Sequence, residues 1–176
     1  MQENFKFVKA AKEHRFMLLD WLDEPHVREC WDVSEGLKNN IENYTQGNKQ
    51  IFDFWVAYID HIPFAQIRTS DALETEPDVF KQYASKTGKT LVLAFVIGNA
   101  HYLGKGLATK TLNAFIAFLK TIEPTVDTLI IAPATRNSRA VHVCTKVGFK
   151  KVTEFETTNG LSSKGHYDLM VRSLTK

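Results

Sequence analysis

The sequence predicts a mixed α/β fold of the α+β type, in which helices pack on a sheet. Short runs of alternating or continuous apolar residues, rich in aromatic and β-branched side chains, recur along the chain as expected for strands. Between these runs, apolar residues recur at helical spacing. A length of 176 residues is enough for one domain with a sizeable core. We therefore expect a single domain over residues 1–176, with a tight two-domain arrangement as the alternative.

The first third of the chain predicts one strand followed by three helical segments. In the first helix Leu18 and Trp21 lie on one apolar stripe, and Pro25 suits the first turn of the second helix. Ser34 is a suitable N-cap for the third helix, and Gly47 ends it. The expected strand is 6–10, and the expected helices are 12–22, 25–31 and 34–47.

The middle of the chain predicts an antiparallel hairpin and then a central strand. Residues 51–60 and 62–69 are rich in aromatic and branched residues, and a short polar turn at Asp60–His61 separates them. Residues 71–89 combine an acidic loop with one or two helical turns. The segment TLVLAFVI, residues 90–97, is apolar on both alternating faces, as a central strand must be.

The last part of the chain predicts a helix, a strand, a second helix and a closing hairpin. The inner stripe of the first helix consists of Ala108, Leu112, Phe115 and Leu119. Residues 127–133 form the strand. Asn137 caps the second helix and Gly148 ends it. The residues of this helix that we expect to face inward are Ala140, Val143, Cys144 and Val147. The hairpin consists of 149–157 and 166–174, with its turn at Asn159–Gly160.

Charge and composition exclude some classes of partner. A formal net charge of +2 and a pI near 8.5 are too mild for a nucleic-acid binder. The N-terminal residues lack the apolar stretch of a signal peptide, and the longest apolar run, LVLAFVIG, is too short to span a bilayer. We therefore expect a cytoplasmic protein, monomeric or homodimeric, that binds neither nucleic acid nor membrane. Cys30 and Cys144 are isolated in the sequence, which predicts free thiols and no metal site.

The segment GNAHYLGKGLATKTL, residues 98–112, predicts an anion-binding turn. It does not fit the nucleotide-binding P-loop, because five residues separate Gly98 from Gly104, and Gly106 stands where that motif needs Ser or Thr. The glycine spacing also excludes a Rossmann fingerprint. What remains is a buried strand, a glycine-rich turn and a helix whose free N–H groups attract an anion, with added charge from Lys105. A plain tight turn is the alternative.

Two motifs in the sequence resemble the GNAT superfamily of N-acetyltransferases. YLGKGLATK is similar to the acetyl-CoA pyrophosphate loop of that family, and NSRAVHVCTKVGF is similar to its second signature, a helix that ends in Gly-Phe. Their separation by one strand also agrees with the family. WLDEPHVRECW followed by LGKGLATK most resembles the aminoglycoside 6'-N-acetyltransferases and their siderophore-pathway relatives. The resemblance implies a mostly antiparallel, twisted sheet that is splayed at its middle strands and flanked by helices.

The resemblance also implies acetyl-CoA as the cofactor and indicates which residues bind it. The main chain of the central strand would bind the pantetheine arm at Phe95, Val96 and Ile97. The glycine turn and the helix after it would bind the pyrophosphate. The residues expected there, together with the cap of the second helix, are Leu103, Gly104, Lys105, Gly106, Leu107, Ala108, Thr109 and Asn137. Leu103 departs from the family, which usually has Gln or Arg at this place.

Acetyl transfer to an amine needs a proton for the leaving thiolate, and Cys144 is the candidate catalytic donor. The family usually has tyrosine at this place in the second helix, and a thiol is also able to donate a proton. A small buried thiol equally serves for packing, which is the alternative.

The sequence carries no acidic residue where related enzymes often have the general base, because that place is Ala94. His101 in the glycine turn is one candidate for this role, and His166 and Asp168 near the C-terminus are others; each also fits a surface position. A mechanism without a base, in which the amine arrives deprotonated, is a further alternative. A backbone N–H of the central strand near Val96 or the following residue would stabilise the developing oxyanion.

Acceptor recognition is expected from an acidic loop and from the segment around Trp31. The stretch DALETEPD carries Glu74, Glu76 and Asp78, which would attract a cationic amine. A solvated acidic loop is the alternative. Trp31 and Asp32 resemble residues that line the acceptor cleft of the aminoglycoside enzymes, although Trp31 also fits a packing role.

The sequence therefore predicts an acetyl-CoA-dependent N-acetyltransferase. It would act by direct attack of a primary amine on the thioester, with a small cationic acceptor that is aminoglycoside-like or polyamine-like. A hydroxylamine siderophore precursor or a protein N-terminus is an alternative acceptor. A CoA-binding module without catalysis is the alternative class, because Ala94 and Cys144 stand at the places of the usual Asp and Tyr.

Overall fold

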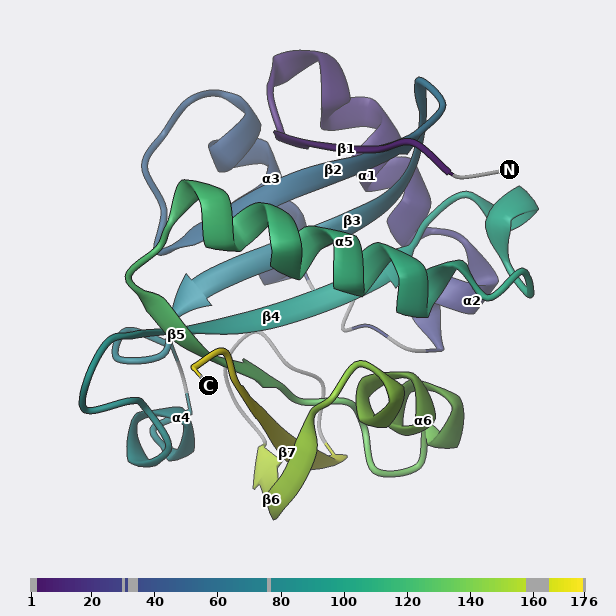
Figure 1. Ribbon diagram of the computed structural model, residues 1–176. Helices are drawn as coiled ribbons and strands as arrows, with labels where there is room; N and C mark the ends of the chain where they lie inside the picture. Colours follow the sequence, from purple (N-terminus) through teal and green to yellow (C-terminus); the bar gives the residue numbers. More distant parts are fainter. Residues whose placement is uncertain (1–2, 30, 32–34, 76, 158–164, 176) are drawn as a thin grey trace.

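A seven-stranded sheet forms the centre of the computed structural model, which describes residues 3–29, 31, 35–75, 77–157 and 165–175. The strands are β1 (Phe5–Lys9), β2 (Phe52–Ile59), β3 (Ile62–Asp71), β4 (Lys89–Ile97), β5 (Val126–Ile131), β6 (Lys150–Thr157) and β7 (Gly165–Ser173). Their order in the sheet is β1-β2-β3-β4-β5-β7-β6 (Figure 1). Every neighbouring pair is antiparallel except β4 and β5, which are parallel. The expected mixed α/β fold with a mostly antiparallel sheet is confirmed.

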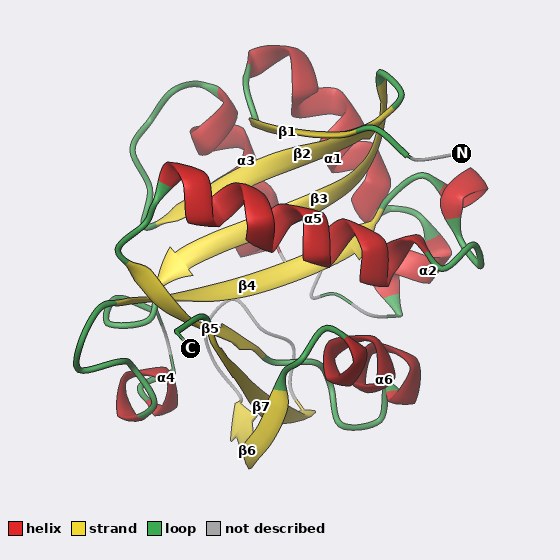
Figure 2. Cartoon of the chain, in the orientation of Figure 1, coloured by secondary structure: helices red, strands yellow, loops and turns green. Residues whose placement is uncertain are grey.

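Helices cover both faces of this sheet (Figure 2). The helix α5 (Leu107–Ile122) packs on one face together with α6 (Ser138–Lys146). The opposite face is covered by α1 (Arg15–Leu22), α2 (Pro25–Arg28) and α3 (Glu35–Thr45). The remaining short elements are α4 (Val79–Gln82) and the 3₁₀ helices η1 (Lys12–His14) and η2 (Ala100–Tyr102).

The apolar stripe of α5 packs as its spacing predicts. Leu112, Phe115 and Leu119 are almost fully buried and belong to one apolar cluster with side chains of six of the strands. Full burial of each such side chain contributes about 1.5–3 kcal/mol. Ala108, the first residue of the expected stripe, is only partly buried. The stripe therefore fixes α5 along β3 and β4, and its N-terminus lies next to the end of β4.

The hairpin of β2 and β3 is also confirmed. Asp60 and His61 form its two-residue turn with φ values of 48° and 72°. Left-handed conformations at both positions match the right-handed twist of the paired strands.

β6 and β7 form the predicted closing hairpin, but β7 lies between β5 and β6 in the sheet. The main-chain pairing of β7 with β5 extends from Thr128↔Ser173 to Ile131↔Met170. The predicted turn at Asn159–Gly160 lies outside the described residues.

Several element boundaries differ from the sequence expectation. The expected helix 12–22 divides into η1 and α1, and the expected helix 25–31 ends at Arg28. The N-cap predicted at Ser34 lies outside the described residues. In α6 only Cys144 is fully buried, while Ala140 and Val143 remain half-buried, because the helix covers only the margin of the sheet. No helix in the described part of the chain has the length and apolar character needed to cross a membrane.

Candidate active site

The sheet opens between β4 and β5. Their pairing ends at Leu93↔Ile131, whereas β4 continues to Ile97 with β3 as its partner. The chain after β5 turns toward β7, where the N–H of Asp168 donates to the carbonyl of Pro133 at 2.9 Å. The two parallel strands therefore diverge over residues 94–97, as the resemblance implies.

The main-chain groups of β4 that face this opening belong to alternate residues. The N–H of Gly98 donates to the carbonyl of Phe64 on β3 at 2.9 Å, so even-numbered residues of β4 bond toward β3. Val96 follows that pattern, and Phe95 and Ile97 direct their N–H and C=O groups toward the opening. Of the three residues expected to bind the pantetheine arm through the main chain, the structure places these two at the opening.

The turn after β4 is shaped by two glycines in the left-handed conformation. Gly104 and Gly106 have φ values of 72° and 70°, and a Cβ at either position would meet no atom within 4 Å. Gly106 is the N-cap of α5, whose first N–H groups have no partner within the helix. The open backbone, the helix terminus and the adjacent cationic Lys105 together fit a pyrophosphate.

The other residues expected in this turn have different surroundings. Leu107 is buried in the core and offers only its N–H group, whereas Leu103 is exposed. Ala108 and Thr109 in the first turn of α5 are half-buried. The Nζ atom of Lys105 lies 6.0 Å from the centre of the Tyr102 ring, which holds the ammonium over the turn.

Asn137 caps α6, as predicted. Its Oδ1 accepts a hydrogen bond from the N–H of Ala140 at 3.1 Å, and the side chain is half-buried. Its expected contact with the cofactor stays a prediction.

Cys144 lies in the core beneath α6, with an exposed fraction of 3%. Burial raises the pKa of its thiol to about 12. A free thiol has a pKa of about 8.5, so the leaving thiolate is a weaker base than the thiolate of Cys144. Proton transfer from Cys144 to the leaving thiolate therefore costs about 1.4 kcal/mol for each unit by which the two pKa values differ. The role as proton donor stays a prediction, and the burial favours packing.

The candidate bases do not gather at the opening. His101 is exposed in η2, where its N–H donates to Asn99 Oδ1 at 3.0 Å. His166 is exposed on β7. Asp168 is buried, accepts a hydrogen bond from Thr135 Oγ1 at 2.7 Å and lies 3.5 Å from Lys151 Nζ.

The residues expected to bind the acceptor are partly described. Trp31 packs against the apolar layer beneath α1 and α3, and Arg68 of β3 lies 6.0 Å from the centre of its ring. Glu74 and Asp78 are exposed, and Asp78 forms an ion pair of 3.0 Å with Lys81. The other two expected acceptor residues, Asp32 and Glu76, lie outside the described residues.

Three residues near the opening were not predicted from the sequence. Arg68 pairs in register with Ala94 and stacks on Phe52, with 5.3 Å between its Cζ atom and the ring centre. Gln66 is fully buried, and neither polar atom of its amide has a partner in the described part of the chain. His26 contacts the carbonyl of Ile97 at 2.8 Å. No local pattern marks these residues, because strand pairing and helix packing bring them to the opening.

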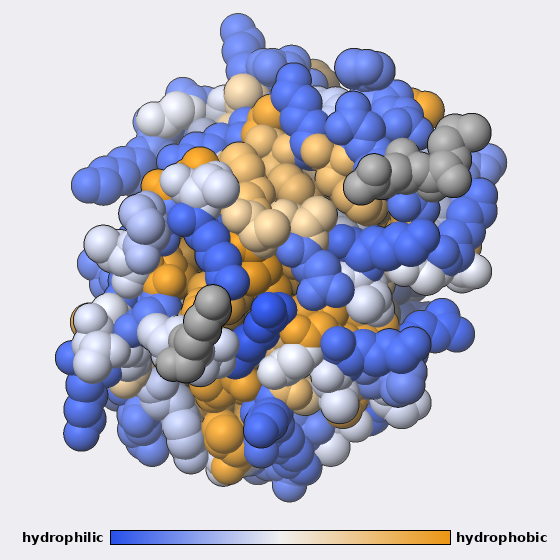
Figure 3. Space-filling model, viewed as in Figure 1, coloured by the Kyte–Doolittle hydropathy of each residue, from blue (hydrophilic) through white to orange (hydrophobic). Residues whose placement is uncertain are grey.

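The surface on the α5 face of the sheet has an apolar band between hydrophilic rims (Figure 3). Half-buried apolar residues that pack against the core beneath this face include Phe95, Phe118 and Val141. Such a surface suits the uncharged arm of a cofactor whose phosphates bind at the start of α5.

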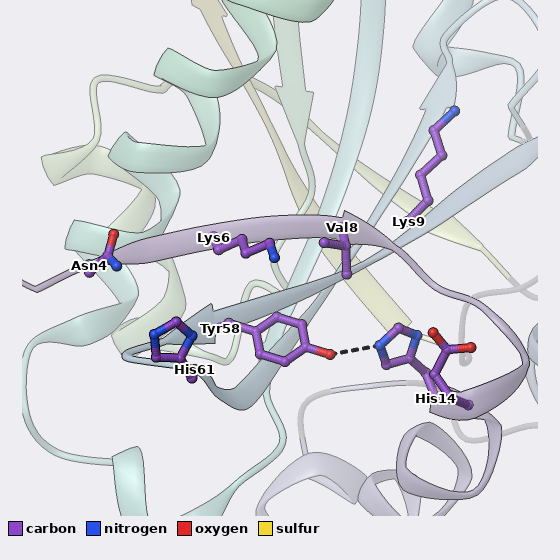
Figure 4. Close-up of a pocket in the computed structure, with 8 residues that line it drawn as sticks. Asn4, Lys6, Val8, Lys9, His14, Tyr58 and His61 are labelled. Carbon is purple, nitrogen blue, oxygen red and sulfur yellow. Dashed lines mark hydrogen bonds between the residues drawn. The ribbon is translucent and has the colours of Figure 1, made fainter.

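Two pockets lie beside other parts of the sheet. One of about 350 Å³ lies at the β1–β2 edge, where His14 Nε2 donates to the Tyr58 hydroxyl at 2.7 Å (Figure 4). Burial lowers the pKa of His14 and raises the pKa of Tyr58. The other, of about 380 Å³, lies between the β5–α6 connection and the last hairpin, and Thr135 and His166 are among its lining residues. Among the described residues that line these pockets, His166 is the only predicted site residue.

Comparisons with known proteins agree with this geometry. The sequence model of the acetyltransferase (GNAT) domain family matches residues 10–157. The chain is 28% identical over 168 residues to aminoglycoside N(6')-acetyltransferase type 1 of Klebsiella pneumoniae, covering 87% of this chain and 78% of that protein. It is also similar to the crystal structure of aminoglycoside N(6')-acetyltransferase from Legionella pneumophila, with 27% identity, a TM-score of 0.78 and coverage of 99% and 94% of the two chains.

A further solved structure shows the same fold. Aminoglycoside acetyltransferase AAC(6')-Ib, in complex with coenzyme A and kanamycin, has a TM-score of 0.78 at 22% identity and covers 97% of this chain and 95% of its own. The family match spans most of the chain, including both motifs. The chain therefore belongs to the GNAT acetyltransferase family and is an acetyl-CoA-dependent N-acetyltransferase.

Proposed function

We propose that this enzyme acetylates a primary amine of a small cationic acceptor, of the aminoglycoside or polyamine kind, by direct attack of the amine on the thioester. The main observation in favour of an acetyl-CoA site here is the divergence of β4 from β5 beside the glycine turn at the start of α5. Acetyl-CoA supplies the activated acetyl group. The N–H groups of Phe95 and Ile97 are suitable donors to an oxygen that gains negative charge at the opening.

The proposal that the acceptor is a small cationic amine is supported by the relatives and by the acidic loop. Relatives at 27–28% identity are named for aminoglycoside N(6')-acetylation. Glu74 and Asp78 are exposed and follow β3, whose last residue Asp71 pairs with Leu91, so they lie beside the start of β4 and not beside the opening at residues 94–97. From there the exposed carboxylates act on a cationic amine through their long-range field.

Arg68 favours a second candidate acceptor. Its guanidinium lies over two aromatic rings, at 6.0 and 5.3 Å from their centres, on the sheet face covered by the N-terminal helices. The planar guanidinium of arginine matches the geometry of a carboxylate. A hydroxylamine or amine of the amino-acid type, as in siderophore precursors, is therefore the second candidate.

A panel assay separates these candidates. Release of free thiol from acetyl-CoA is followed with kanamycin, spermidine, an N-hydroxylated diamino acid and an N-terminal peptide as acceptors. We expect the highest kcat/KM with a cationic small molecule. Faster turnover of the diamino acid would favour the second candidate, and thiol release no faster than in buffer with every amine would contradict the proposed function.

Neutralising the acidic loop is expected to weaken acceptor binding alone. Glu74→Gln with Asp78→Asn, with or without Glu76→Gln, should raise the KM for a cationic acceptor by about two- to fivefold, as expected for exposed charges. Added salt should reproduce the effect, because exposed charges are screened. Glu35→Gln, an exposed acid that pairs with Lys38, is the matched control. Unchanged kinetics under both treatments would identify the loop as solvated surface.

Cys144→Ala is expected to keep turnover within about threefold of wild type and to lower stability by about 1 kcal/mol, because the thiol is buried and a weak acid. Cys144→Tyr should be less stable by about 1–3 kcal/mol because it overpacks the core. Turnover and melting temperature of both variants test this. A fall in turnover by a factor of about 10²–10⁴ in Cys144→Ala, with normal acetyl-CoA affinity, would instead identify Cys144 as the proton donor.

A further inference from the structure

The histidine of α2 reaches across the fold to the open end of β4. Pro25 begins α2, and Val27, which is fully buried, anchors the helix in the core. His26 between them is half-buried, and its Nε2 atom lies 2.8 Å from the carbonyl oxygen of Ile97, 71 residues away in the sequence. The layer of N-terminal helices and the strand at the opening thus meet at this imidazole.

The contact fixes the tautomer of the ring. A carbonyl oxygen only accepts hydrogen bonds, so Nε2 of His26 must carry the proton. The neutral ring then has its lone pair on Nδ1. Within the described residues no hydrogen bond to this Nδ1 atom is found. The geometry therefore holds the imidazole in the form that is able to accept a proton.

The ring also lies beside one of the two N–H groups proposed to stabilise the oxyanion. Ile97 offers its carbonyl to His26, and its N–H faces the opening, so the imidazole and this N–H meet at one residue of β4. Phe95, which offers the other N–H, lies about 7 Å farther back along the strand. Trp31, three residues beyond α2, continues the same segment.

We propose that His26 is the general base of the reaction, an inference that rests on the proposed function. The proton of the acceptor nitrogen passes to Nδ1 of His26, directly or through one water, as the nitrogen–carbon bond forms. The carbon–sulfur bond breaks, and its electron pair leaves with the sulfur, which is protonated by solvent. The imidazolium then returns its proton to solvent. This role explains how transfer proceeds with Ala94 in the strand.

The titratable groups nearest His26 along the chain and along β4 lie on two segments. Glu24 and Arg28 flank it on α2, and Arg28 is paired with Asp23 at 3.0 Å. His101 and Lys105 follow β4 on the exposed turn. The paired end of β3, residues 62–65, contributes no titratable side chain.

His26→Gln tests the proposal, because the glutamine Nε2 is still able to donate to the Ile97 carbonyl but the amide takes no proton. We expect kcat to fall by a factor of about 10²–10⁴ with acetyl-CoA affinity in calorimetry within about threefold of wild type. His142→Gln, on the exposed side of α6, is the matched control and should behave as wild type.

Two kinetic or binding results would overturn the proposal. They are wild-type turnover in His26→Gln and a loss of acetyl-CoA affinity greater than about tenfold in that variant. Nitrogen NMR of the isotope-labelled wild type reports the tautomer of His26 without any acceptor present. A neutral ring with its proton on Nδ1 instead of Nε2 would equally contradict the proposal. These kinetics can be measured with any amine whose acetylation releases CoA. If cationic acceptors alone fail, the proposed acceptor class is wrong, but the proposal for His26 is still tested with the amine that reacts.

Discussion

Gly106→Val is expected to abolish acetyl-CoA binding, with a loss of affinity of at least ~100-fold. Gly106 has a φ of 70° as the N-cap of α5, a conformation that costs a residue with a side chain about 1–2 kcal/mol. The valine side chain would also fill the open space in front of the helix terminus. Loss of one charge-assisted hydrogen bond to phosphate adds about 1.5–3 kcal/mol. Calorimetric titration with acetyl-CoA measures the effect.

Gly47→Val is the matched control for this variant. Gly47 follows α3 with a φ of 89° and, like Gly106, has no atom within 4 Å of an added Cβ. The turn after α3 lies far from the start of α5 (Figure 1), and α3 covers the opposite face of the sheet. Gly47→Val should therefore show a similar loss of stability with normal acetyl-CoA affinity. Equal affinity in folded Gly106→Val would place the pyrophosphate elsewhere.

Gly98→Ala is expected to destabilise the fold by more than about 3 kcal/mol, beyond the usual range for overpacking. A Cβ at Gly98 would overlap Cγ, Cδ2 and Cε3 of Trp21, a buried residue of α1. The clash involves a rigid ring held against the end of β4, so side-chain rotation does not relieve it. The midpoint of urea unfolding measures the loss.

A double-mutant cycle identifies the cause. Trp21→Leu removes the ring atoms, so Gly98→Ala in that background should cost less than about 1 kcal/mol, and the two substitutions should couple strongly. An equal cost of Gly98→Ala in both backgrounds would show that the ring is not the reason for glycine at this position.

The features that the sequence predicts correctly depend on neighbours in the chain. The stripe of Leu112, Phe115 and Leu119 determines which face of α5 is buried, because helical spacing repeats locally. The Asp60–His61 turn defines the β2–β3 hairpin in the same way. The glycine-rich turn between the central strand and the next helix is also predicted from local pattern, and the structure gives its glycines the left-handed conformation at the start of α5. Its role as an anion site stays a prediction.

The features that only the tertiary structure decides depend on residues far apart in the chain. β7 lies between β5 and β6, although sequence order suggests the reverse, because strand pairing is decided by which edges the packed core leaves available. Arg68 reaches Ala94 through the pairing of β3 with β4.

His26 meets Ile97 only because α2 packs on the sheet. Local patterns carry no information on such contacts, whose formation requires closing long loops during folding. The glycine turn is therefore readable from the sequence, whereas the contacts of His26 with Ile97 and the pairing of Arg68 with Ala94 are assembled by the fold.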